Sequence, residues 1–83
     1  MRNIVRVLRL KMSVQAQNIG ECIYKRRKRL NISQVDLAEM SGVSLRTINA
    51  IERGEANPTV DVLSKVLAPL GLVISLQERV IHE

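Results

Sequence analysis

Residues 33–54 read SQVDLAEMSGVSLRTINAIERG, and this stretch decides the fold of the chain. Its spacing of apolar and polar residues predicts two short helices, one over residues 34–40 and one over residues 45–53. Residues 41–43 join the helices, and Gly42 suits a corner that requires a positive φ. The stretch therefore predicts two helices that meet at a tight turn, which is a helix-turn-helix.

Both helices have start and stop signals in the sequence. Ser33 is the expected N-cap of the first helix, and Asp36 three residues later gives the spacing of a capping box. Ser44 is the expected N-cap of the second helix. Gly54 then supplies a C-terminal stop. These signals are local, so they predict the two helices before any packing is considered.

The residues around this pair predict three more elements. Residues 17–30 carry an apolar stripe, with Cys22 beside it, which predicts a preceding helix. Thr59 is the expected N-cap of a later helix, which should end or distort near Pro69. Residues 72–78 alternate in the way that a strand does. The chain is therefore predicted to be an all-α bundle of four to five short helices with one short C-terminal strand.

The predicted strand also predicts a second copy of the chain. A lone strand leaves its backbone groups without partners, and the most economical partner is the same strand of a second copy, which gives a homodimer. Residues 14–71 would form the helix-turn-helix domain, and residues 72–83 the dimerisation strand and tail. Two interpretations of residues 1–13 stay open: a basic arm, or a non-native extension if Met12 is the true start. The residues expected at the dimer contact are Leu72, Ile74 and Leu76.

Composition narrows the function classes. The chain has 83 residues and a net charge of +5, which indicates a polyanionic partner, nucleic acid before membrane. The single cysteine cannot form an internal disulfide, so we expect a reducing cytoplasm. No apolar run approaches the roughly 20 residues of a membrane span. The sequence holds no paired carboxylates, Cys/His cluster or glycine-rich phosphate loop, so we expect no enzyme, metal or cofactor.

Three stretches within residues 18–76 carry a family resemblance: IGECIYKRRK, SQVDLAEMSGVSLRTINAIERGEANPT and LSKVLAPLGL. Together they resemble the Xre/Cro family of helix-turn-helix regulators, also called lambda-repressor-like domains. The resemblance implies a sequence-specific DNA-binding repressor of transcription. The short length and the ending GLVISLQ are similar to the HipB-type antitoxins, which pair through C-terminal strands and bind a HipA-type kinase toxin.

Two hypotheses within this class follow. The leading one is a dimeric repressor that binds a palindromic operator in double-stranded DNA and serves as the antitoxin of a toxin–antitoxin system. The alternative is a stand-alone Xre-family regulator, of the phage or restriction-modification controller type. A module that uses the same helices to bind only protein lies outside the class, and the basic charge argues against it.

The second helix of the pair is expected to lie in the major groove, where each base pair shows a distinct donor–acceptor pattern. Arg46 can bond guanine and Asn49 can bond adenine, each in bidentate fashion. Thr47 can contact a thymine methyl or a phosphate. Ser44 either contacts phosphate or only caps its helix. The resemblance implies that Gln34 contacts the DNA backbone or the edge of the groove.

The basic residues are expected to divide between two roles. Arg53, Lys28 and Arg26 are candidates for phosphate contacts, which position a protein on DNA without reading sequence. Arg27 borders the apolar stripe, so a structural role is expected there instead. In the resembled family, an Arg at this position pairs with the Glu that matches Glu52. We therefore predict an ion pair between Arg27 and Glu52.

Overall fold

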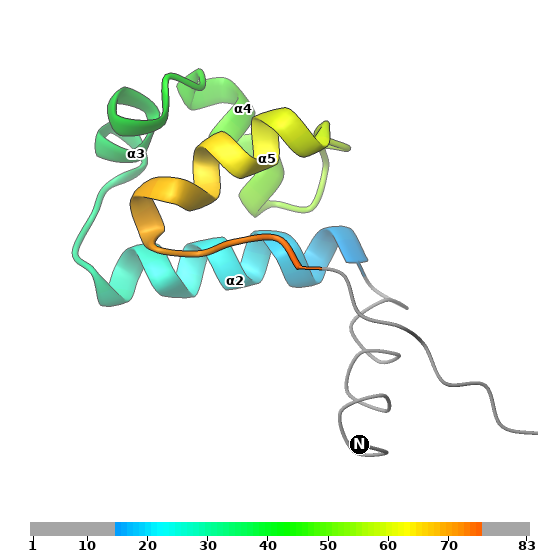
Figure 1. Ribbon diagram of the computed structural model, residues 1–83, viewed down its shortest axis with the longest axis horizontal. Coiled ribbons are helices and arrows are strands. Elements are labelled where there is room, and N and C mark those ends of the chain that lie inside the picture. Colours follow the sequence, from blue (N-terminus) through cyan, green and yellow to red (C-terminus); the bar gives the residue numbers. More distant parts are fainter. Residues whose placement is uncertain (1–14, 76–83) are drawn as a thin grey trace, which may run out of the picture.

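The structure is a computed structural model that describes residues 15–75, and all the regular secondary structure in this part of the chain is helical (Figure 1). The all-α prediction is confirmed for these residues. Figure 1 shows α2 along one side of the domain and the other helices grouped across from it. The elements are α2 (Gln15–Arg29), α3 (Gln34–Ser41), α4 (Leu45–Glu52), α5 (Val60–Leu67) and the 3-10 helix η1 (Ala68–Leu70).

Side-chain caps begin α3, α4 and α5 where the sequence predicts them, whereas α2 begins at Gln15, two residues before its predicted start. Ser33 Oγ accepts from the backbone N–H of Asp36 at 2.9 Å, and the Ser33 N–H donates to the Asp36 carboxylate at 3.2 Å. This reciprocal pair is the predicted capping box. Ser44 Oγ accepts from the N–H of Thr47 at 3.1 Å, and Thr59 caps α5 in the same way. The predicted N-caps of α3, α4 and α5 are therefore confirmed.

The corner between α3 and α4 depends on Gly42, as the sequence predicts. Its φ is 72°, and its N–H donates to the carbonyl of Ala38 at 3.0 Å, which closes the last turn of α3. Any residue with a Cβ is strained at this φ, because the Cβ crowds the neighbouring carbonyl. The sharp turn lets α4 cross α3 directly, and this crossing places the side chains of the site described below.

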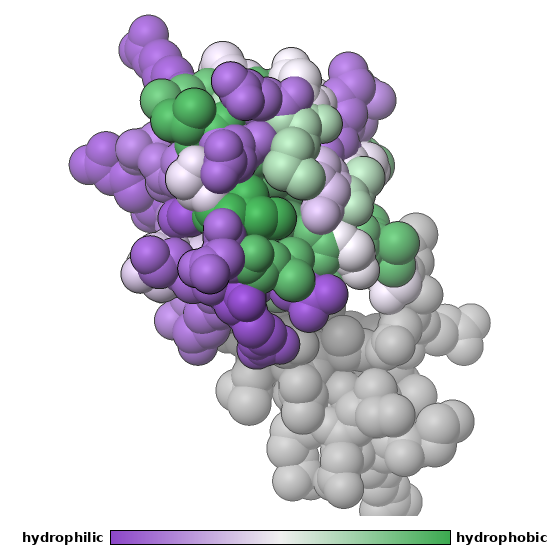
Figure 2. Space-filling view, turned by 90° about the vertical axis from the view of Figure 1, so that its left-hand side faces the viewer, coloured by the Kyte–Doolittle hydropathy of each residue, from purple (hydrophilic) through white to green (hydrophobic). Residues whose placement is uncertain are grey.

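The hydrophobic core lies between α2 and the other helices. A rim of hydrophilic side chains surrounds an apolar patch on one face of the molecule (Figure 2), so part of the apolar surface stays open to solvent. Within residues 15–75 the buried hydrophobic side chains are Ile23, Leu37, Val43, Ile48, Ile51, Val66, Leu67 and Leu70.

Two expectations about apolar segments differ from the structure. Cys22 is exposed, because it is one residue before buried Ile23 and therefore points about 100° away around α2. Residues 72–75 form no strand: they run as irregular backbone after η1 (Figure 1). Residues 76–78 of the predicted strand, and all of the basic arm 1–13, lie outside the described residues.

Gly20 marks a close approach of α2 to α4 that the sequence analysis does not single out. A Cβ at this position would collide with the backbone carbonyl of Ile51 and lie 2.7 Å from the carbonyl oxygen of Glu52. A glycine inside a helix costs about 1 kcal/mol relative to alanine, which makes such a residue a signal of close packing. None of the helices in residues 15–75 has the length and hydrophobicity to cross a membrane.

Candidate nucleic-acid interface

A buried ion pair joins α2 to α4. Arg27 Nε donates to Glu52 Oε2 at 2.7 Å, and Arg27 Nη2 donates to Glu52 Oε1 at 2.9 Å, so the contact is bidentate. The two side chains are only 8% and 5% exposed. Arg27 Nη1 also donates to the carbonyl of Ile32 at 3.0 Å, which ties down the link between α2 and α3. The structure thus contains the ion pair that the sequence predicts.

The surroundings of Arg27 stabilise the charged form of its guanidinium. Its hydrogen bonds to the Glu52 carboxylate raise the pKa of Arg27 above its ordinary value, while burial acts in the opposite direction. Because a buried charge without a partner is very costly, the pairing explains why an arginine can occupy this position. The pair is a structural contact, and neither side chain is free to bind a ligand.

Hydrogen bonds continue from Glu52 to the outer side of α4. Gln34 Nε2 donates to Glu52 Oε1 at 3.0 Å, and Asn49 Nδ2 donates to Gln34 Oε1 at 3.4 Å. Arg53 Nη1 in turn donates to Asn49 Oδ1 at 3.4 Å. Gln34 and Asn49 come from different helices, yet the network holds their amides together. The two 3.4 Å bonds are long and therefore weak, so both amides can exchange them for other partners.

The start of α4 is held by its own cap. Ser44 Oγ donates to Thr47 Oγ1 at 2.8 Å and accepts from the N–H of Thr47. Of the two roles considered for Ser44, the structure shows the cap. Arg46, the second residue of α4, is exposed. Along the outer side of α4 runs a hollow of about 710 Å³, the α4 hollow, lined by Leu45, Arg46, Asn49, Ala50, Arg53 and Glu55.

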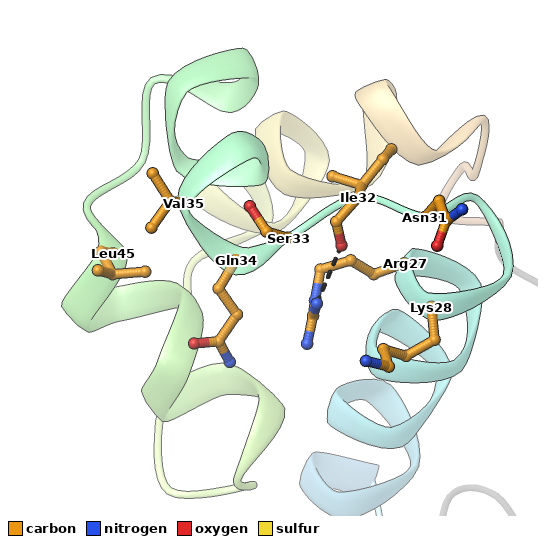
Figure 3. Close-up of a pocket in the computed structure, with 8 residues that line it drawn as sticks. All are labelled: Arg27, Lys28, Asn31, Ile32, Ser33, Gln34, Val35 and Leu45. Carbon is orange, nitrogen blue, oxygen red and sulfur yellow. Dashed lines mark hydrogen bonds between the residues drawn. The ribbon is translucent and has the colours of Figure 1, made fainter.

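A second hollow, the α3 hollow, opens between the end of α2 and the starts of α3 and α4. Its volume is about 440 Å³. Figure 3 shows Lys28 extending from α2 toward the middle of this space, with Gln34 opposite it. Leu45 lines both hollows, so they adjoin at the start of α4. We call the surface made by Lys28, Gln34, Leu45, Arg46, Asn49 and Arg53 the recognition face.

Arg26 lies apart from the recognition face. Its Nε donates to the carbonyl of Leu70 at 2.8 Å, which ties α2 to the end of η1. Arg26 and Arg27 are adjacent on a helix and therefore point about 100° apart, so one is directed to η1 and the other to α4. The sequence predicts a phosphate contact from Arg26, whereas in the structure its guanidinium makes this internal bond.

The residues expected at a dimer contact do not share one environment. Leu72 is half-buried against the core of its own chain. Val73 is 85% exposed and Ile74 is also exposed, while Leu76 lies outside the described residues. Leu72 thus has an internal packing role that the sequence analysis does not predict. Ile74 remains a candidate for contact with another chain.

The sequence predicts no role for Leu45 or Val35. In the structure Leu45 belongs to the recognition face, and Val35 lines the α3 hollow with it. Leu45 precedes the core residue Ile48 by three positions, a spacing that is typical of a shared buried face. In the structure Leu45 is nevertheless 44% exposed, and Val35 is 52% exposed. The signal that could have found Leu45 is its position as the first residue of α4, directly after the cap Ser44.

Comparison with known proteins finds relatives named as HTH-type transcriptional regulators. An uncharacterized HTH-type transcriptional regulator of Haemophilus influenzae is 46% identical over 50 residues, which cover 60% of this chain and 51% of the relative. An HTH-type transcriptional regulatory protein of Methanococcus vannielii is 45% identical over 47 residues, which cover 57% of this chain and 14% of the relative. The chain thus matches about half of the first relative's length and a smaller part of the second's.

No solved structure matches the chain at a significant level. The family model HTH_3, described as Helix-turn-helix, matches residues 23–76, which include α3, α4, α5 and both partners of the buried ion pair. Because this match covers more than half of the sequence, the chain belongs to the helix-turn-helix family.

Proposed function

We propose that this protein binds double-stranded DNA sequence-specifically and represses transcription. The observation that carries the proposal is the hydrogen-bond network that runs from the buried pair to Gln34 and Asn49. It presents amide groups from α3 and α4 at one place, beside the exposed cation of Arg46. Such an arrangement suits base edges, which are recognised by donors and acceptors at fixed positions. The regulator names of the two relatives support the same function.

The proposed docking places α4 in the major groove, with its first residues toward the bases. Arg46 would bond guanine, and Asn49 would bond adenine once it gives up its long bond to Gln34. A good bidentate pair of this kind contributes about 1–3 kcal/mol of discrimination between bases. Lys28 and Arg53 would contact phosphates on either side of the helix and set the register.

We further propose a homodimer on a palindromic operator, with half-sites about one helical turn apart. The exposed side chains of Val73 and Ile74, on the segment that leaves η1, favour a contact with another chain at this end. Within that proposal, a HipB-like antitoxin that represses its own operon and binds a HipA-type kinase toxin is our preferred role. A stand-alone regulator is the alternative, and a kinase-like toxin gene beside this one would favour the antitoxin.

A mobility-shift titration with the DNA upstream of the gene tests the proposal. Arg46→Ala and Asn49→Ala should each weaken binding to this DNA about ten-fold or more, and should leave binding to an unrelated duplex nearly unchanged. Lys65→Ala is the matched control, because Lys65 is an exposed cation on α5 that is paired with Asp61 at 3.2 Å. Equal affinity for both duplexes, unaffected by the α4 variants, would contradict sequence-specific binding.

A mass measurement on the protein purified from its native operon tests the assembly. Twice the mass of the chain supports the homodimer, and an additional kinase-sized component supports the antitoxin role. A monomer that still binds the upstream DNA would contradict the dimer while leaving DNA binding in place. Ile74→Asp provides a variant of the exposed segment, and it should weaken a dimer that uses this contact because it places a charge in an apolar interface.

A further inference from the structure

Two exposed apolar side chains lie among the polar and charged residues that line the two hollows. Val35 and Leu45 both line the α3 hollow, where Figure 3 shows them next to each other on the side opposite α2. Leu45 also lines the α4 hollow, beside Arg46 and Asn49. A ligand that extends across both hollows must therefore pass over Leu45.

The neighbours of this pair restrict what that ligand can be. Lys28 and Arg46 favour an anion, and the amide of Gln34 favours a ligand with donors and acceptors. In the DNA major groove, the apolar group that a base pair presents is the C5 methyl of thymine, and aliphatic side chains contact it. RNA carries uracil without this methyl, and its A-form major groove is too deep and narrow for side chains to read.

We infer that Val35 and Leu45 form a contact for a thymine methyl group and make this protein select thymine at one position of each half-site. The inference rests on the proposed function, since it adds a specificity-determining pair to the same recognition face. Leu45 belongs to the first turn of α4, and the first residues of a recognition helix are those that reach base edges. Val35 belongs to the first turn of α3 and lies next to Leu45 (Figure 3).

The test uses a duplex selected by the wild-type protein from a random library. Each thymine of that duplex is replaced in turn by deoxyuridine, which removes the methyl group and keeps every hydrogen-bonding group. Wild-type affinity should fall about four-fold at one thymine per half-site, the effect expected when one methyl group is no longer buried. For Leu45→Ala and Val35→Ala, the thymine and deoxyuridine duplexes should bind with nearly equal affinity.

Matched controls separate this contact from general effects. Val60→Ala removes the same atoms as Val35→Ala from an exposed position at the start of α5, and it should keep the full dependence on the methyl group. Circular dichroism should show all the variants folded, because both test side chains are about half exposed.

The outcomes distinguish the inference from the function on which it rests. If the wild-type protein selects no sequence from the library, both the proposed function and the inference fail. If it selects a sequence but tolerates deoxyuridine at every position, the inference alone fails. A methyl dependence that persists in both Leu45→Ala and Val35→Ala would overturn the assignment to these residues.

Discussion

Replacing Glu52 with alanine should remove a large part of the stability of this domain. The change deletes the acceptors of two bonds from Arg27, at 2.7 and 2.9 Å, and of the bond from Gln34 at 3.0 Å. The Arg27 guanidinium would then remain buried with the carbonyl of Ile32 as its acceptor. Breaking a buried pair from one side costs about 3–5 kcal/mol, chiefly because the remaining charge has no partner.

This cost is large compared with the total stability. At about 0.05–0.15 kcal/mol per residue, the described residues 15–75 would have a free energy of unfolding of about 3–9 kcal/mol. Glu52→Ala should therefore lower the melting temperature by more than about 12 °C, or leave the domain unfolded at room temperature. Urea titration and thermal melting, both followed by circular dichroism at a helical band, measure the change.

Glu21→Ala is the matched control, because Glu21 makes an exposed ion pair with Lys25 at 3.7 Å. An exposed pair of this kind contributes less than about 1 kcal/mol, so the control should melt near the wild type. The paired replacement Arg27→Met with Glu52→Leu should recover most of the loss, since it leaves no unpaired charge. The explanation is refuted if Glu52→Ala has the same melting temperature as the control. It is also refuted if the paired replacement is no more stable than Glu52→Ala.

Three other substitutions follow from particular contacts. Gly20→Ala should lower the free energy of unfolding by about 1–3 kcal/mol, because its Cβ would collide with the backbone of α4 even though alanine favours helix. Urea titration measures the change, and an increase in stability would contradict it. Arg26→Met should cost about 1 kcal/mol through its lost bond to Leu70 and leave DNA affinity within two-fold. Lys28→Met should leave the free energy of unfolding unchanged. It should make the slope of log binding constant against log salt concentration less steep by about one, because one phosphate contact is lost. Exchanged effects of these two variants would show that their assigned roles are wrong.

The helix starts could be predicted from the sequence because their causes are local. A serine cap acts on backbone groups two or three residues away, so Ser33, Ser44 and Thr59 carry their own signal. The Arg27–Glu52 pair was also predictable, but through family resemblance, because 25 residues separate the partners. The network that extends from this pair to Gln34 and Asn49 was not predicted, since it depends on how α3 and α4 cross.

The remaining differences have physical causes that a sequence pattern does not contain. The sequence of residues 72–78 alternates as a strand does, but a strand forms only beside a partner; of this segment the structure describes residues 72–75, which are irregular, and Leu72 packs against the core of its own chain. The roles of Arg26 and Arg27 on α2 are likewise not contained in the sequence pattern. Which arginine faces η1 and which faces α4 depends on the rotation of α2, and the packing of Gly20 and Ile23 against the other elements sets that rotation. Composition alone treats the arginines as equivalent.

The buried pair also predicts how specificity and affinity can be separated. In the variant that combines Arg27→Met with Glu52→Leu, the fold should persist, yet Gln34 loses the acceptor that fixes its amide. Lys28 and Arg53 are exposed and stay in place, so the salt slope of DNA binding and the affinity for an unrelated duplex should remain as in the wild type.

Affinity for the selected duplex should fall about two- to ten-fold in this variant, because the amide of Gln34 is no longer held by Glu52 before binding and must be ordered by the DNA. Parallel titrations of both duplexes over a range of salt concentrations measure the ratio of the affinity for the selected duplex to the affinity for the unrelated duplex. If the variant folds and keeps the wild-type ratio, sequence recognition does not depend on the network, and the buried pair serves stability alone.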